Sequence, residues 1–316
     1  MADISRTDVA TLIQEAYADT LLAAATAAST TLTAFSTVPM GTKTTHMPVL
    51  ATLPEAGWVS ESATQSAGVK PQSEAAWQDR TLVAEEIAVI IPVHENVIDD
   101  ATTAVLSQLT ELGGQAIGKK LDQAVLLGVD KPASWVSPAL LPAATAAGQV
   151  QAVVNGQANE SDIVGAVNKV SEKIAVAGWA PDTLIAGLGM RFQVANLRDA
   201  DGQPIFRDES FGGYMTHFNK NGAWDPTSAT ALVVDQSRVK IGVRQDITVK
   251  FLDQATLGTG ASAINLAERD MVALRFKARF AYVLGDSANS TGNGSRCPVG
   301  AVTPAAVEEV DPDEEP

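Results

Sequence analysis

The sequence predicts an α+β fold in which some segments extend away from a compact body. Three stretches of the chain support this prediction. Residues 95–128 have the apolar spacing of one long helix, and residues 271–284 alternate apolar and basic side chains as a strand does. Residues 42–80 are polar and rich in turn-forming side chains, and an excursion of this length is uncommon in a compact domain unless it has a function.

The composition allows a large core and argues against several classes of function. Of the 316 residues, 46% are hydrophobic but only 5% are aromatic, so many small side chains must fill the core. The net charge is −15 and no cluster of Lys and Arg is visible, which argues against a sequence-specific nucleic-acid reader. Cys297 is the only cysteine, which excludes an intrachain disulfide and fits a reducing cytoplasm. No apolar run of about 18 residues occurs, so we expect no membrane span.

The N-terminal region is predicted to hold a helix followed by an extended excursion. Within residues 7–28, apolar side chains recur at steps of three and four positions, at Val9, Leu12, Ile13, Ala16, Tyr17 and Leu21. One helix cannot bury such a face alone, so the face must pack on the body or on a neighbouring molecule. The β-branched run after Ala28 should weaken this helix. Extended pieces at 46–53 and 77–93 flank the excursion, whose tip is expected near 63–71.

The long helix is predicted to run through a pair of glycines, Gly113 and Gly114. Each costs about 1 kcal/mol relative to alanine in a helix interior. The pair is compatible with two arrangements, either a weak point or kink in the helix, or the close approach of a neighbouring backbone. Gly128 is a natural end for this helix because glycine readily adopts the left-handed conformation found at many helix C-termini.

Residues from about 150 to 245 are predicted to form a separate α/β lobe. Helices are expected at 162–177 and 189–198, and strands at 183–186 and 231–235. This alternation of helix and strand distinguishes the lobe from the strand-rich region that follows it.

The region after this lobe is predicted to be rich in strands, at 239–243, 247–251 and 271–284. The last strand places Arg275, Lys277 and Arg279 on one face and apolar side chains on the other. We expect the apolar face to lie on the long helix and the basic face to meet solvent or a partner. The end of the chain carries six acidic residues within 308–315, among prolines, and is expected to be a solvated, disordered tail.

The usual signatures of catalysis and metal binding are missing from the sequence. The three histidines, His46, His94 and His217, are far apart and lack the spacing of a helical metal site. Gly187 and Gly189 lie between a strand and a helix, but Phe192 stands where a phosphate cradle needs its third glycine, so a tight turn is expected. We therefore expect no enzyme activity and no cofactor. A soluble α/β enzyme with a site near residues 187–191 remains a distant alternative.

Six segments of the chain carry a resemblance to a known protein family. They span 38–63, 87–100, 120–128, 197–206, 239–249 and 270–280. The second of them reads Ile-Ala-Val-Ile-Ile-Pro-Val-His-Glu-Asn-Val-Ile-Asp-Asp. In their order and spacing, these segments resemble the major capsid proteins of tailed bacteriophages, which have the HK97 fold.

The resemblance implies a division of the chain into six parts. These are an N-terminal arm (1–38), an extended β-hairpin loop or E-loop (39–85), a peripheral domain or P-domain with the spine helix and a β-sheet (86–149), an α/β axial domain or A-domain (150–245), return strands of the peripheral domain (246–291) and a flexible acidic tail (292–316). The arm and the loop match the outlying segments read from the residues, and the spine helix matches the long helix. Such a division suits a subunit that builds a shell.

The resemblance also implies a function without catalysis. The chain would assemble in the host bacterial cytoplasm into the icosahedral head shell of a virion and enclose double-stranded DNA without sequence specificity. Its partners would be other copies in hexamers and pentamers, a portal protein at one vertex, and separate scaffolding or decoration proteins. A scaffolding segment of the kind that precedes the arm in many relatives has no room before Thr42, so assembly would use a separate scaffold or none. An encapsulin-type nanocompartment shell, which shares the fold, is the alternative.

Assembly contacts are expected on the arm, on the loop and on the basic strand face. The expected contact residues are Val9, Leu12, Ile13 and Tyr17 of the arm, Trp58, Glu61 and Lys70 of the loop, and the cations Arg80, Arg275, Lys277 and Arg279. Some relatives join a loop lysine to an asparagine of a neighbour, and Lys70 with Asn289 or Asn293 would be the candidates here. Deletion of residues 1–38 is expected to leave a folded subunit that fails to assemble.

Overall fold

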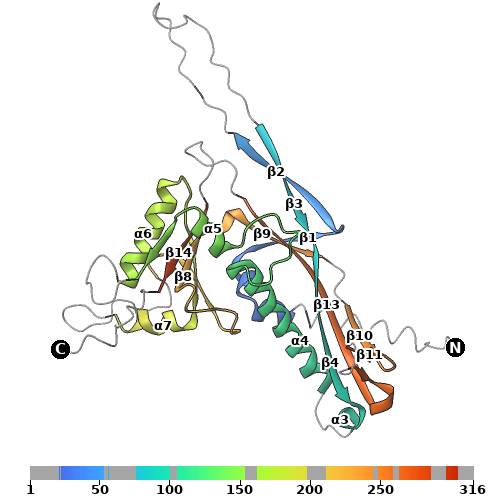
Figure 1. Cartoon of the computed structure of the whole chain (residues 1–316). Helices are drawn as coiled ribbons and strands as arrows, with labels where there is room; N and C mark the ends of the chain where they lie inside the picture. The colour runs from blue at the N-terminus through green and yellow to red at the C-terminus, as the bar shows by residue number, and fades with distance from the viewer. Residues whose placement is uncertain are drawn as a thin grey trace, which may run out of the picture.

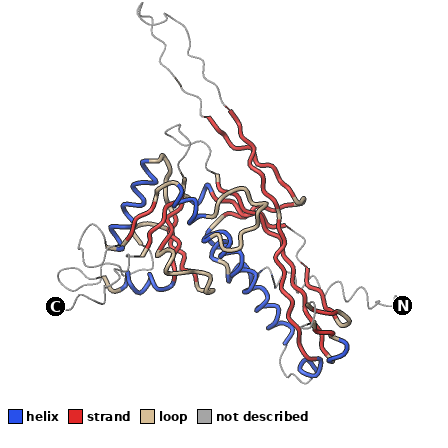
Figure 2. The backbone as a smooth tube through the Cα atoms, viewed as in Figure 1, coloured by secondary structure: helices blue, strands red, loops and turns tan. Residues whose placement is uncertain are grey.

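The computed structural model describes residues 21, 23–52, 56, 76–99, 105–153, 162–197, 211–244, 248–258, 263–285 and 297–304. These residues form two lobes and a ribbon of two strands that projects beyond both (Figures 1 and 2). One lobe is a sheet with a long helix along it, and the other is a sheet between helices. This mixture of helices and sheets agrees with the predicted α+β class. None of the described helices is long and apolar enough to cross a membrane.

The first lobe, called the peripheral lobe here, is built around one long strand. Its sheet contains β1 (Ser36–Met40), β4 (Glu85–His94), β9 (Val239–Arg244), β10 (Thr248–Leu252) and β13 (Met271–Leu284). Strand β13 pairs with β4 along one edge, and with β10 and then β9 along the other. The bounds predicted for β13 are confirmed, because its strict alternation of apolar and charged side chains is a strong strand signal.

The two faces of β13 meet different surroundings. Phe276 and Phe280 are fully buried on the face that packs against α4 (Val105–Asp122), while Arg275, Lys277 and Arg279 are partly exposed on the opposite face. The predicted contact between the apolar face and the long helix is confirmed. Toward its end β13 is buried on both faces, because the base of the ribbon covers Ala281 and Val283.

The stretch predicted as one helix over 95–128 contains three elements. These are α3 (Glu95–Asp99), α4 and a π-helical turn, η1 (Gln123–Leu127), which ends at Gly128 with φ +79°. Residues 100–104 lie outside the described residues. The predicted start at Glu95 and the predicted stop at Gly128 are confirmed, while the continuity of the helix through residues 100–104 stays a prediction.

The glycines of α4 mark a close crossing with the N-terminal helix. A Cβ at Gly114 would lie 2.6 Å from Cβ of Ala24, and a Cβ at Gly118 would lie 2.9 Å from the carbonyl oxygen of Ala25. At Gly113 the added atom would lie 2.7 Å from the ring of Phe276. Because α4 continues through all three glycines, the close approach of a neighbouring backbone is confirmed and a break in the helix is not.

The described part of the N-terminal region belongs to the body of the subunit. Residues 23–28 are helical, and the helix is interrupted at Ser29. A new helix, α2 (Thr30–Ala34), begins there, and the Ser29 hydroxyl caps it by accepting a hydrogen bond from the amide of Leu32. The N-terminal helix, predicted to weaken after Ala28, is therefore interrupted at Ser29, and a second helix with its own N-cap follows. Leu21 and Phe35 are buried in the main core. Deletion of residues 1–38 would remove these buried side chains from the main core, so a shorter truncation is needed to test the arm.

The second lobe, called the axial lobe here, is a five-stranded sheet with helices on both faces. The strand order is β5 (Val150–Ala152), β14 (Val299–Thr303), β8 (Ala231–Val234), β6 (Thr183–Gly187) and β7 (Met215–Asn219). One face packs on α6 (Ile163–Val176) and α7 (Leu188–Ala195), and the other on α5 (Leu140–Ala146) and η1. The helices and strands predicted for this lobe are confirmed within a few residues at their ends, except that the predicted helix at 189–198 starts and stops earlier.

One strand of the axial lobe lies within the range that was predicted to be a flexible acidic tail. Residues 292–316 were expected to be flexible, yet β14 lies in the middle of the sheet and is buried along almost its whole length. A Cβ at Gly300 would lie 2.3 Å from Val170 and 3.1 Å from Ile174, so the glycine lets α6 pack directly on β14. The acidic residues themselves lie outside the described residues.

The remaining described elements are the ribbon and several short strands and helical turns. The ribbon consists of β2 (Thr44–Thr52), close to the first predicted extended piece, and β3 (Ala76–Val83). The second predicted piece, 77–93, is divided between β3 and β4, which belong to different sheets. Short elements complete the list: η2 (Gln236–Arg238), β11 (Thr256–Leu257), β12 (Ile264–Asn265) and η4 (Ala267–Arg269).

Candidate assembly surfaces

The ribbon is the most prominent surface that lacks a partner within its own chain. Strands β2 and β3 pair antiparallel from Thr44 opposite Val83 to Thr52 opposite Ala76, and neither pairs with another described strand. Figure 1 shows the ribbon extending away from both lobes. A two-stranded ribbon is marginally stable alone, and its edges carry free hydrogen-bonding groups. Trp77, near its outer end, is 69% exposed. These features fit a surface that is covered by another molecule.

The base of the ribbon is fixed while its outer part is free of the body. Leu82 and Ala84 are buried against Ala281 and Val283 of β13, and Met40 completes this small cluster. Further out, Nδ1 of His46 lies 2.5 Å from a carboxylate oxygen of Asp79 across the two strands, in an exposed position. The packing at the base therefore sets the direction in which the ribbon leaves the subunit.

A row of cations crosses the open part of the peripheral sheet. Arg275 lies opposite Lys250 of β10 on one side and Ile90 of β4 on the other, and the row continues through Lys277 and Arg279. Ile90 is 42% exposed. Nε of Arg275 is buried and has no hydrogen-bond partner within the described part of the chain. On a chain with a net charge of −15, this basic row is a local exception.

Glu86 is the single carboxylate that pairs with the basic row among the described residues. Its Oε2 lies 2.9 Å from Nζ of Lys277 and 3.4 Å from a guanidinium nitrogen of Arg279. The hydrogen bond from Lys277 is the main cause that lowers the pKa of Glu86; Arg279 adds to it, and desolvation opposes it. Arg275 and Lys250 have no carboxylate within 4.0 Å among the described residues, so this part of the row can attract a further anionic group.

A buried carboxylate joins the two lobes to the N-terminal region. Asp122, at the end of α4, is fully buried and accepts hydrogen bonds from two separate segments, residues 29–31 and 219–221. The donors are the hydroxyl of Ser29 (2.6 Å), the backbone amides of Thr30 (2.9 Å) and Thr31 (3.0 Å), and Nδ2 of Asn219 (3.0 Å) and Asn221 (2.8 Å). Hydrogen bonds to a charged acceptor are the stronger kind, and this set stabilises the carboxylate without a cation. Asp122 thus fixes how the lobes sit on each other.

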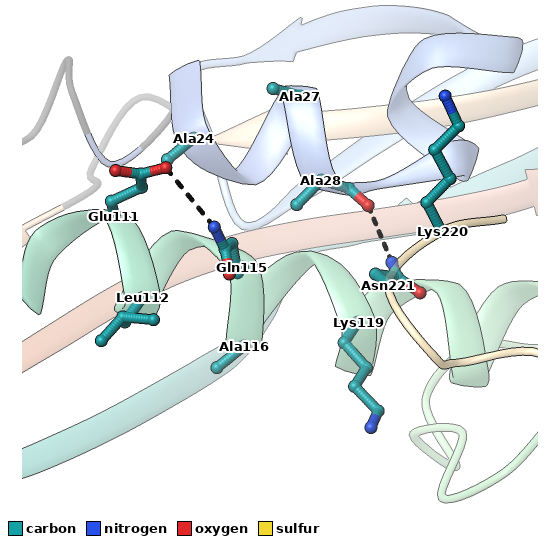
Figure 3. Close-up of a pocket in the computed structure, with 10 residues that line it drawn as sticks. All are labelled: Ala24, Ala27, Ala28, Glu111, Leu112, Gln115, Ala116, Lys119, Lys220 and Asn221. Carbon is teal, nitrogen blue, oxygen red and sulfur yellow. Dashed lines mark hydrogen bonds between the residues drawn. The ribbon is translucent and has the colours of Figure 1, made fainter. Parts of the chain in front are cut away.

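A groove of about 580 Å³ lies beside this junction, between the N-terminal helix and α4 (Figure 3). Ala24, Ala27 and Ala28 line one side and residues 111–119 of α4 line the other. Lys119 and Lys220 stand at one end of the groove and Glu111 at the other, where it accepts a hydrogen bond from Gln115. The groove therefore combines small apolar side chains with a basic end.

The structure places only some of the expected contact residues. Arg275, Lys277 and Arg279 come together in the basic row, whereas Arg80 is separate from them, half-buried on β3 opposite Met47. Val9, Leu12, Ile13, Tyr17, Trp58, Glu61 and Lys70 lie outside the described residues, as do Asn289 and Asn293.

Gly187, just before α7, has a packing role. A Cβ at Gly187 would lie 2.5 Å from the ring of Trp224, which covers this turn. Gly187 ends β6 and precedes the first turn of α7, as predicted for a tight turn. No group of His, Cys, Asp and Glu suited to a metal ion occurs among the residues that the structure describes.

The sequence analysis missed the Asp122 junction and the contribution of Lys250 to the basic row. Asp122 carries a weak signal, since it lies next to Leu121 and three positions before Val125, both fully buried, and a carboxylate on a buried helix face requires donors. Nothing local indicated that Asn219 and Asn221 supply them. Lys250 is visible only through the pairing of β10 with β13.

Comparison with known proteins identifies the family. The model of the phage capsid family matches residues 10–289 of this chain. This chain belongs to the phage capsid family. A solved chain from Mycobacterium phage Cain is 72% identical, with a TM-score of 0.80 and an alignment that covers 97% of this chain and 100% of that one. No curated protein matches the chain.

More distant structures agree with this family. A chain from Microbacterium phage Oxtober96 is 37% identical with a TM-score of 0.76, covering 96% of this chain and 100% of that one. The capsid of a native GTA particle, 17% identical, has a TM-score of 0.57, covers 88% of this chain and 90% of that one, and shows the fold alone. The protein is a major capsid protein of a tailed phage and forms part of the virion shell, so the phage capsid is favoured over the encapsulin alternative.

Proposed function

We propose that copies of this chain form hexamers and pentamers that close into an icosahedral head shell with the HK97 arrangement. The observation that carries this proposal is the ribbon β2–β3, which projects from the body and pairs with no other described strand. Because a ribbon of this kind is marginal alone, its stability requires contact with neighbouring copies. Exchange of such segments lets each subunit bury surface outside its own core.

The basic row supplies a complementary contact. Each copy carries a net charge of −15, so copies repel one another unless local attraction offsets this. Arg275 and Lys250 lack a carboxylate within 4.0 Å among the described residues, and they lie on the part of the sheet that the chain's own ribbon leaves open. We assign this surface to an acidic segment of a neighbouring copy.

The finer division of the chain and its other partners belong to the same proposal. The arm with Val9, Leu12, Ile13 and Tyr17, and the loop with Trp58, Glu61, Lys70 and Arg80, are assigned to contacts between copies. The described core begins by residue 21, so the proposed arm ends there. The axial domain includes β14, whereas β9, within the predicted axial range 150–245, belongs to the peripheral sheet. Double-stranded DNA inside the shell and a portal at one vertex follow from this function.

A charge-reversal experiment tests the role of the basic row. The double variant Lys250→Glu with Arg275→Glu is expected to fold but to form no shells, because two new carboxylates repel the acidic partner. The matched control, Lys250→Arg with Arg275→Lys, keeps the charge and should form shells. Electron microscopy and sedimentation measure assembly, and circular dichroism measures the fold. Normal shells from the charge-reversed variant would contradict the assignment.

A truncation tests the arm separately. Deletion of residues 1–20 leaves Leu21 and the buried part of the N-terminal helix in place. The expected product is a subunit with unchanged thermal stability and impaired assembly. Shells of normal size and yield from this truncation would show that the arm is dispensable.

A further inference from the structure

We propose that the acidic C-terminal segment of the chain, residues 305–316, docks in the groove between the N-terminal helix and α4 of its own subunit. The groove is lined by alanines on both helices, with Leu112 54% exposed beside it. Its basic end is formed by Lys119 and Lys220. The groove and its charges are independent of the ribbon and of the basic row.

The chemistry of the segment complements that of the groove. Residues 305–316 read Ala-Ala-Val-Glu-Glu-Val-Asp-Pro-Asp-Glu-Glu-Pro, with six carboxylates and no cation. Its first three side chains, up to Val307, are small and apolar, and the six acids follow with Val310 among them. The groove likewise combines small apolar side chains with two lysines. Among the described residues, neither Lys119 nor Lys220 has a carboxylate within 4.0 Å. Charge complementarity therefore selects this segment over a neutral one.

The topology of the axial sheet brings the segment to the groove. Val302 of β14 pairs with Ala231 of β8, Ala231 pairs with Ala186 of β6, and Ala186 pairs with Phe218 of β7. The end of β14 and the end of β7 therefore lie in one row, at the same edge of the sheet.

The distance to be crossed is short compared with the length of the segment. Three strand spacings of about 4.8 Å separate β14 from β7, which is about 14 Å in total. Lys220 follows the last residue of β7 directly, and Pro304 follows the last residue of β14. Twelve extended residues span up to about 40 Å, so the segment reaches the basic end of the groove within one subunit.

Docking there would hold the N-terminal helix on α4. The helix crosses α4 at Gly114 and Gly118, and the groove follows the open side of this crossing. A segment seated in the groove contacts both helices and adds to the area that keeps them together. The last residues of the chain would then act as a strap across the junction near Asp122.

Disulfide trapping tests the proposal on the full chain. Ala116→Cys places a thiol in the groove and Val310→Cys places one in the acidic segment; the natural Cys297 is buried. The matched control replaces Ala116→Cys with Ala133→Cys, at an exposed alanine away from the groove. Mild oxidation of the assembled and the unassembled protein is followed by non-reducing electrophoresis.

The expected result is an intrachain disulfide in the groove pair. It should form about tenfold faster than in the control pair, the ratio that a docking free energy of about 1.4 kcal/mol gives. Lys119→Glu with Lys220→Glu should remove the difference, as should 1 M salt, which shortens the screening length to about 3 Å. Equal rates for both pairs would overturn the docking. A product that is mainly a disulfide-linked dimer, in either state, would overturn the same-subunit assignment in favour of a second copy.

Discussion

The carboxylate of Asp122 lies 3.0 Å from the side-chain amide of Asn219, although the two residues are 97 positions apart in the chain. Asp122 ends the long helix of the peripheral lobe, and Asn219 ends an edge strand of the axial lobe. The same carboxylate binds the start of α2. A shell subunit must hold its lobes at a defined angle, and this buried group provides a fixed point between them.

The first prediction concerns this carboxylate. Asp122→Asn keeps the shape but places an amide among five donors, so at least one buried donor loses its acceptor. We expect the free energy of unfolding of the unassembled subunit to fall by about 3 kcal/mol. Denaturant titration measures it. The control is Asp130→Asn, which removes an exposed ion pair with Lys120 and should change the stability by less than about 1 kcal/mol. Equal effects of the two variants would refute the role of the junction.

The second prediction concerns the crossing of the N-terminal helix over α4. Gly114→Ala would place a methyl group 2.6 Å from Cβ of Ala24 and 3.0 Å from the backbone nitrogen of Ala25, so the helix must move away. Overpacking of this kind costs about 1–3 kcal/mol and outweighs the better helix propensity of alanine. Thermal unfolding and hydrogen exchange of residues 23–34 measure the effect.

The matched control for this crossing is Gly189→Ala. Gly189 lies inside α7 and has no atom within 4 Å of an added Cβ. There alanine should leave the stability unchanged or raise it by up to about 1 kcal/mol. A loss of stability at Gly189 as large as that at Gly114 would show that the glycine contact is not the cause.

Strands with strict alternation could be predicted from the sequence, and central strands of mixed composition could not. The bounds of β13 follow from its own residues because one face is buried on α4 and the other carries cations. Strand β14, Val-Gly-Ala-Val-Thr, is buried on both faces and has no alternation to reveal it. In the sequence Gly300 suggests a turn, whereas in the structure a glycine is needed there because α6 packs closely on β14.

The candidate surfaces also differ in how far they could be predicted from the sequence. Most of the basic row could be predicted, because Arg275, Lys277 and Arg279 share one face of β13. The Asp122 junction depends on donors from segments about 90 residues away on either side, and no local pattern indicates which distant side chains meet. The role of Gly114 was left open by the sequence and decided by the crossing of the two helices.

The third prediction concerns pH and His217. Burial lowers the pKa of His217 on β7, so the folded protein takes up this proton at a lower pH than the unfolded chain does. The stability contributed by the neutral ring is complete above the ordinary histidine pKa of about 6.5 and declines as the pH falls through the folded value. We expect His217→Gln to flatten the loss of stability between pH 7 and pH 5, measured by thermal unfolding. His94→Gln, at an exposed position, should leave that slope unchanged.

The last prediction concerns Glu86 and the basic row. Because Lys277 and Arg279 lower the pKa of Glu86, the unfolded chain binds this proton at a higher pH than the folded one. The stabilisation is therefore complete above the ordinary glutamate pKa of about 4.3 and is lost as the pH falls through the lower folded value. Glu86 is partly exposed, so Glu86→Gln should cost only about 0.5 kcal/mol at pH 7. That cost should decrease as the pH falls below the ordinary glutamate pKa, in denaturant titrations at pH 7 and at an acidic pH. Glu268→Gln, at an exposed site without a described ion pair, should have no cost at either pH. A cost for Glu86→Gln that persists unchanged at the lower pH would mean that the carboxylate acts by packing and not by its charge.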